Sequence, residues 1–109
     1  MEVGFDDVDL AKICGSEREM LRKLGTVRAK RLQVRLKQLK AAETLADLRS
    51  MPGRFHELQG DRAGQLSLDL DGPYRLLFRP VGDARHHRGS GPDWSARAVV
   101  AVGIVDTHD

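Results

Sequence analysis

The sequence predicts an α+β fold, with N-terminal helices packed on a twisted, mostly antiparallel sheet of four to five strands. Apolar residues recur at helical spacing through residues 8–42, and the period changes to two after Gly53. Residues 98–105 form an almost continuous aliphatic run, which is typical of a central strand buried on both faces. With 109 residues the chain can bury one modest core, so we expect one domain over residues 1–109.

Turn signals divide the first part of the chain. Residues 1–5 suit a short edge strand, and residues 8–24 follow a helical pattern with a break at Gly15. After this break Ser16 is expected to cap a new helix, because Glu19 completes the capping-box spacing.

The longest helix is predicted over residues 27–42, with Gly25 ending the preceding helix and Thr26 as the N-cap. Its buried stripe follows i, i+4, i+7 spacing and consists of Leu32, Leu36 and Leu39. A short amphipathic turn over residues 43–49 follows, and Pro52 with Gly53 ends the helical part.

Period-two alternation predicts strands over residues 54–58, 65–70 and 74–79, followed by a long surface loop over residues 80–94. In the second strand the leucines face the core, and the residues that face away are Gln65, Ser67 and Asp69. In the third strand the face opposite Tyr74, Leu76 and Phe78 carries Arg75, Leu77 and Arg79.

Positive charge is concentrated in the predicted helices. Residues 20–42 contain eight of the eighteen basic residues and no acidic residue, although the formal net charge of the chain is only +2. A segment of one charge sign suggests contact with a polyanion or an acidic protein surface. The alternative is a solvated helix face without a charged partner.

Composition also bounds the compartment. No apolar run approaches the ~20 residues that span a bilayer, and the charged N-terminus does not resemble a signal peptide. The single cysteine, Cys14, excludes an internal disulfide and suits a reducing cytosol. We therefore expect a cytoplasmic protein without a membrane partner.

Four residues are candidates for catalysis. His56 lies on the opposite strand face from Phe55, and an imidazole is well suited to acid–base catalysis near neutral pH, although His56 also suits an ordinary edge position. Arg75 sits between hydrophobic residues, so an anion should meet it, either a carboxylate such as Asp106 or a substrate phosphate. Asp106 and His108 follow the predicted central strand and project to the same side if the chain stays extended.

Other site classes find little support. His86 and His87 share a loop with Asp83 and Asp93, but adjacent histidines point apart and no Cys cluster or HxxxH spacing accompanies them. Gly60–Gly64 lacks the Lys-Ser/Thr of a phosphate-binding loop, and no Gly-x-Ser-x-Gly elbow exists. We expect neither a metal nor a cofactor.

An ordered set of motifs resembles the HigB-type killer toxins, the plasmid-maintenance branch of the RelE/ParE toxin superfamily. After the basic helix come Leu48-Arg-x-x-Pro52-Gly53, His56-x-Leu58-x-Gly60-Asp61-Arg62-x-Gly64, Ser67-Leu-Asp, Tyr74-Arg75-Leu76-x-Phe78 and Val105-Asp106-x-His108. The resemblance covers nearly the whole chain, which would make residues 1–109 a single RelE/HigB-like toxin domain.

The resemblance implies ribosome-dependent cleavage of messenger RNA and neutralisation by a HigA-type helix-turn-helix antitoxin, through which the complex would contact operator DNA. By position it implies catalytic roles for His56, Arg75, Asp106 and His108. Thr107 stands where members often carry tyrosine. Residues expected to contact RNA or the ribosome are Arg28, Lys30, Arg31, Arg35, Lys37, Arg62 and Arg79.

The residues and the resemblance together predict metal-free RNA cleavage. One histidine would take the ribose 2′-OH proton and the other would protonate the leaving 5′-oxygen. Arg75, helped by Arg62 or Arg79, would stabilise the phosphorane, and Asp106 would orient His108. There are two alternatives. The first is a ParE-like toxin that binds gyrase without nuclease chemistry, and the second is an inactive homologue kept for antitoxin binding.

Overall fold

A single sheet organises the molecule, with strand order β1-β5-β4-β3-β2. The computed structural model describes residues 1–82 and 91–107. The strands are β1 (Glu2–Phe5), β2 (His56–Glu57), β3 (Leu66–Asp69), β4 (Tyr74–Val81) and β5 (Ala98–Asp106). β1 pairs parallel with β5, and the other neighbours pair antiparallel.

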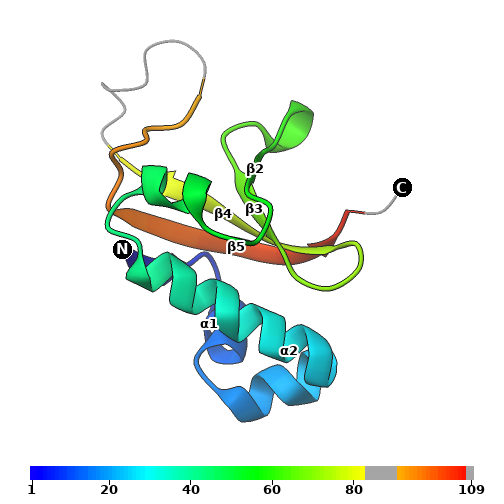
Figure 1. The fold of residues 1–109 in the computed structure, drawn as a ribbon. Helices are drawn as coiled ribbons and strands as arrows, with labels where there is room; N and C mark the ends of the chain where they lie inside the picture. Colours follow the sequence, from blue (N-terminus) through cyan, green and yellow to red (C-terminus); the bar gives the residue numbers. More distant parts are fainter. Residues whose placement is uncertain (83–90, 108–109) are drawn as a thin grey trace.

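Two α-helices, α1 (Val8–Cys14) and α2 (Glu17–Ala41), lie together on one side of this sheet (Figure 1). The predicted α+β class, with helices packed on one face of a mostly antiparallel sheet, is confirmed. A 3-10 helix, η1 (Leu45–Ser50), connects α2 to the strands, and a second, η2 (Gly60–Arg62), lies in the β2–β3 connection.

Side-chain caps fix where the helices begin. The Asp7 carboxylate accepts a hydrogen bond from the Leu10 amide at 2.7 Å, and the Ser16 hydroxyl accepts one from the Glu19 amide at 3.3 Å. Each bond satisfies an amide that has no partner within the first helical turn. The predicted break at Gly15 and the cap at Ser16 are therefore confirmed.

Gly25 interrupts the regular backbone of α2. Its φ of 80° and ψ of 171° are not helical, so α2 consists of two helical segments that meet at a kink. Glycine adopts this positive φ without the Cβ clash that other residues suffer. The predicted stop at Gly25 is thus seen as a kink within one long element.

The core lies between α2 and the sheet. The predicted stripe of Leu32, Leu36 and Leu39 is buried, and Leu76 and Phe78 of β4 are fully buried in the same cluster. Each such side chain stabilises the fold by roughly 1.5–3 kcal/mol.

Three sequence expectations change in detail. The strand predicted over residues 54–58 is reduced to His56–Glu57, because Arg54 has a left-handed φ of 51°. β4 continues past residue 79 to Val81, beyond the predicted loop boundary. Ser67 does lie on the face away from the helices, but it is fully buried there, as is its cross-strand partner Leu77.

Candidate active site

Cross-strand register gathers polar side chains on the far face, meaning the sheet face opposite α1 and α2. His56 is paired with Ser67, and Asp69 is paired with Arg75. Paired residues project to the same face, and the alternate positions of β3 and β4 are occupied by core leucines. His56, Ser67, Asp69 and Arg75 therefore share the far face.

Asp69 is the centre of this group. Its Oδ1 lies 3.2 Å from Nε of Arg75, and its Oδ2 lies 3.6 Å from Nε of Arg54. The carboxylate that meets Arg75 is thus that of Asp69, where the sequence had left open a carboxylate such as Asp106 or a substrate phosphate. The Arg75 contact is an ion pair without hydrogen-bond geometry, since Oδ1 of Asp69 accepts no hydrogen bond from any described residue.

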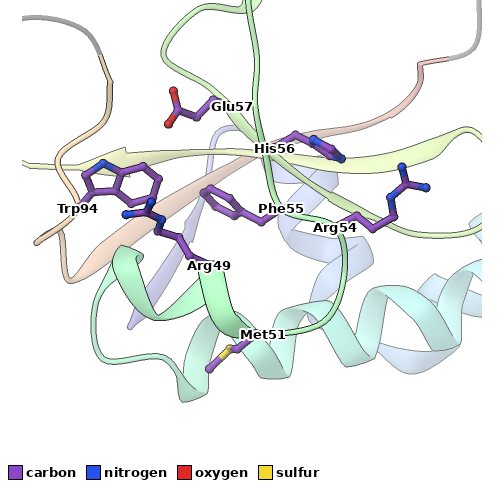
Figure 2. A pocket seen from close by; sticks show the side chains of 7 residues that line it. All are labelled: Arg49, Met51, Arg54, Phe55, His56, Glu57 and Trp94. Atoms are coloured by element: carbon purple, nitrogen blue, oxygen red, sulfur yellow. The ribbon is translucent and has the colours of Figure 1, made fainter.

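Arg54 is a member of the site that sequence reasoning missed. It is the one non-glycine residue with positive φ in residues 1–82 and 91–107, and its side chain is 76% exposed. Figure 2 shows its guanidinium and the His56 ring on the same side of the chain, away from Phe55. Backbone strain of this kind clusters at functional sites. The available signal was its position, directly after Pro52-Gly53 and two residues before His56.

His56 is half-buried, and its Nε2 atom is buried without a hydrogen-bond partner in the described part of the chain. The Oγ atom of Ser67, its cross-strand partner, is likewise buried and has no hydrogen-bond partner in the described part of the chain. Leaving a buried polar atom unpaired costs about 1–3 kcal/mol. A substrate group that bonds to His56 would recover part of this free energy.

His56 and Arg75 do not touch directly, because β3 lies between their strands. Strand spacing and residue rise put their Cα atoms on the order of 12 Å apart. Arg54 and Asp69 fill the interval, since the Asp69 amide donates to the Gly53 carbonyl at 2.8 Å. Two guanidinium groups, one carboxylate and one imidazole thus line a continuous strip.

Three other residues that the sequence assigned to the reaction, Asp106, Arg62 and Arg79, are not part of this strip. Asp106 is paired with Tyr74, so its side chain starts from the opposite sheet face to Arg75. Arg62 is exposed in η2, and Arg79 forms an ion pair with Asp6 at 3.4 Å. His108 lies outside the described residues.

The predicted RNA-binding residues of α2 fall into two groups. Lys30, Arg31 and Lys37 are exposed. Arg28 instead binds both carboxylate oxygens of Asp71, at 2.9 and 3.2 Å, and its guanidinium lies 3.4 Å from the centroid of the Tyr74 ring. This second group is therefore engaged within the fold.

Arg35 also belongs to the engaged group, because only 8% of it is exposed. Its Nε donates to the Asp69 carbonyl at 2.7 Å, and its Nη1 donates to Gln38 Oε1 at 2.9 Å. Gln38 in turn donates to the Pro52 carbonyl at 2.8 Å. Burial lowers the pKa of the Arg35 guanidinium, and neighbouring Arg31 lowers it further. These bonds join α2 to two segments of the strip, Asp69 at the end of β3 and the chain at Pro52, just before Arg54.

A pocket of about 540 Å³ opens beside β2 (Figure 2). Within it the Arg49 guanidinium lies 4.5 Å from the centroid of the Trp94 ring, and the Phe55 ring centroid lies 5.8 Å from that of Trp94. The residues that line the pocket are Arg49, Met51, Arg54, Phe55, His56, Glu57 and Trp94. It therefore shares Arg54 and His56 with the strip on the far face.

Neither a metal-binding cluster nor a membrane-spanning helix is found among the described residues. No three His, Cys, Asp or Glu side chains among residues 1–82 and 91–107 are placed to hold a metal ion. His86 and His87, considered above, lie outside that part. No helix described by the structure combines the length and apolar character needed to cross a bilayer.

The fold is that of RelE-like toxins. The YoeB/ParE toxin from Agrobacterium tumefaciens superposes with a TM-score of 0.62 and 13% sequence identity, over 100% of both chains. This likeness establishes the fold alone. No curated protein matches the sequence.

The family follows from the sequence itself. The family model described as the RelE-like toxin of type II toxin-antitoxin system HigB matches residues 5–87. The chain therefore belongs to the HigB-like toxins and is the toxin component of a type II toxin-antitoxin system, with an antitoxin as its partner.

Proposed function

We propose that this toxin is a ribosome-dependent endoribonuclease that cleaves messenger RNA without a metal ion. The observation that carries the proposal is the strip formed by His56, Arg54, Asp69 and Arg75 on the far face of the sheet. On such a strip an imidazole can exchange a proton, and guanidinium groups can neutralise charge on a phosphate. Membership of a family of generally ribonucleolytic toxins supports the same reading.

In the proposed reaction a base removes the proton from the ribose 2′-OH, and the oxygen attacks the adjacent phosphorus. The bond to the 5′-oxygen breaks, and that oxygen takes a proton from the complementary acid. The products are a 2′,3′-cyclic phosphate and a 5′-hydroxyl. We assign one proton transfer to His56 and, from sequence position alone, the other to His108.

Arg54 and Arg75 would stabilise the phosphorane in this scheme. Both guanidinium groups already face an anion, the Asp69 carboxylate, and Arg54 is largely exposed to solvent. A substrate phosphate has the charge and oxygen geometry to take over these contacts. We assign no orienting role to Asp106, because its strand register directs it to the other face of the sheet.

The exposed cations of α2, namely Lys30, Arg31 and Lys37, would bind phosphates of ribosomal RNA. We further propose that the antitoxin is a HigA-type helix-turn-helix protein, that operator DNA is contacted only through it, and that the toxin acts in the cytoplasm.

The proposal is tested by His56→Gln and Arg75→Gln variants, with Arg18→Gln as a control on an exposed part of α2. Cleavage of message on ribosomes, mapped by primer extension, should fall by about 10²–10⁴-fold for His56→Gln. It should fall by about 10²–10³-fold for Arg75→Gln. The control should cleave as the parent does, and circular dichroism and antitoxin binding should be unchanged in all three.

Two outcomes would contradict the nuclease. Intact message together with induction of the DNA-damage response indicates a gyrase-binding toxin. Intact message, normal growth and retained antitoxin binding indicate an inactive homologue that serves only in operon control.

A further inference from the structure

We propose that the pocket beside β2 binds the base of an unpaired RNA nucleotide next to the cleaved phosphate, with the base stacked on the Arg49–Trp94 pair. This inference rests on the proposed nuclease function and names a substrate subsite within it. The pocket is defined here by Arg49, Arg54, His56 and Trp94, which come from η1, the β2 segment and the chain before β5.

The first argument is continuity with the catalytic strip. Arg54 and His56 line the pocket and also belong to the far face. Figure 2 shows the Arg54 guanidinium and the His56 ring on the other side of the β2 segment from Arg49 and Trp94, so the pocket and the strip meet along this segment. The volume of about 540 Å³ is within the range of small-molecule binding sites, so a base and its ribose fit inside it.

The second argument is the stacking surface. The Arg49 guanidinium lies 4.5 Å from the centroid of the Trp94 ring, and Arg49 is exposed while Trp94 is half-buried. Unpaired bases stack on aromatic rings and on guanidinium planes, and this mode dominates recognition of single-stranded RNA. A cation on an indole supplies both surfaces at one place.

The third argument is that this platform is held in place. The Trp94 ring packs against Phe55, which also packs against Phe78 of the core with ring centroids 6.2 Å apart. The Trp94 carbonyl accepts a hydrogen bond from the Ala46 amide of η1 at 3.0 Å. Arg49 belongs to the same 3-10 helix, so both members of the stack are positioned before a ligand arrives.

Charge selects the ligand class. Arg49 and Arg54 contribute two cations to the pocket, against one carboxylate from Glu57. This balance suits a nucleotide, which combines a flat base with an anionic phosphate. An acidic segment of the antitoxin would use the cations but has no need of a stacking surface.

Trp94 is the single tryptophan of the chain, so its fluorescence reports on this pocket alone. We would titrate the full-length toxin with 5′-AMP, with ribose 5-phosphate and with inorganic phosphate. The nucleotide should quench the fluorescence saturably and bind at least about tenfold more tightly than ribose 5-phosphate, given ~1–3 kcal/mol for one stacked base. Arg49→Ala should weaken 5′-AMP binding to the level of ribose 5-phosphate.

Two variants act as controls. Lys12→Ala, on the exposed surface of α1, should bind 5′-AMP as the parent does. Arg75→Gln, which does not line the pocket, should lose cleavage while still binding 5′-AMP, and this separates the pocket from the proposed chemistry. If neither the parent toxin nor its variants cleave RNA, but the parent still binds 5′-AMP and Arg49→Ala does not, the nuclease proposal fails and the subsite stands.

Equal affinity for 5′-AMP and ribose 5-phosphate would overturn the subsite, because it would show a phosphate site without a base contact. Absence of saturable quenching by 5′-AMP would overturn it as well. If the antitoxin quenches Trp94 through Arg49 while 5′-AMP does not, the pocket is a protein interface.

Discussion

At the scale of single residues, the local environment decides which groups react. Arg54 combines strained backbone, a largely exposed guanidinium and a carboxylate neighbour, which together suit exchange of one anion for another. Cys14 is the opposite case. Burial raises the pKa of its thiol from 9.0 to about 11, and this outweighs the opposing effect of Lys40.

The raised pKa predicts an unreactive native thiol. At pH 8 about a thousandth of the native Cys14 would be thiolate, against about a tenth in the unfolded chain, and thiolate is the nucleophile. Iodoacetamide should therefore label the folded toxin about 100-fold more slowly than the urea-unfolded toxin. Mass spectrometry measures both rates, and similar rates would contradict the prediction.

The same shift has a consequence for stability. The unfolded thiol ionises at lower pH than the native one, so the stabilising contribution is complete below pH 9. It is lost as the pH rises through about 11. We would measure the free energy of unfolding by urea denaturation at a series of pH values. The decrease at alkaline pH that is due to Cys14 should be absent in the Cys14→Ser variant.

At the scale of elements, Arg35 connects α2 to the catalytic strip. Its guanidinium holds the Asp69 carbonyl and, through Gln38, the Pro52 carbonyl. A Cβ atom at Gly53 would lie 3.1 Å from that guanidinium, at a φ of 118° that other residues rarely adopt. Glycine is therefore required where the chain passes over Arg35.

This contact predicts the effect of Gly53→Ala. The variant should lower the free energy of unfolding by about 1–3 kcal/mol for the backbone alone, with an added loss from displacement of Arg35. It should also reduce cleavage, because Arg54 follows directly. Gly64→Ala is the matched control, since Gly64 has a φ of 90° but no atom within 4 Å of the added carbon. Equal losses for the two variants in urea denaturation would show that the Arg35 contact is unimportant.

At the scale of the whole molecule, the charged surfaces are divided between two faces of the fold. The helix layer presents Lys30, Arg31 and Lys37, while the far face of the sheet carries the catalytic strip. Arg28 and Arg35, although part of the same charged segment of sequence, serve to hold α2 against the strands. The number of cations available to RNA is therefore smaller than the sequence suggests.

Salt dependence tests this division. Binding of the toxin to ribosomes should weaken with salt, with a log–log slope that falls by about 0.7–0.9 for each phosphate contact removed. The triple variant Lys30→Gln, Arg31→Gln, Lys37→Gln should thus lose roughly 2–3 units of slope. A matched triple of exposed residues outside residues 30–37, Lys12→Gln, Arg18→Gln and Arg97→Gln, removes the same charge and should leave the slope nearly unchanged. Equal slopes for the two triples would exclude residues 30–37 of α2 as the docking surface.

Local periodicity accounts for most of the fold that the sequence predicts. The buried stripe that contains Leu36 can be predicted from the helical period alone. The placement of His56 on the face opposite Phe55 can be predicted from alternation along a strand. The motif order similarly predicted the HigB-like family that the family model confirms. These properties depend on neighbours in the chain, so one sequence suffices.

The partners of the charged residues depend instead on contacts between distant segments. Asp69 meets Arg75 because β3 pairs with β4 in one register, and Arg35 is buried because α2 crosses the turn at Gly53. Trp94 reaches Arg49 because the segment before β5 bonds to η1. By itself, then, the sequence determined the elements, their buried faces and the family. Only the tertiary structure decided which charges meet, because Coulomb and hydrogen-bond energies depend on distances that local pattern does not contain.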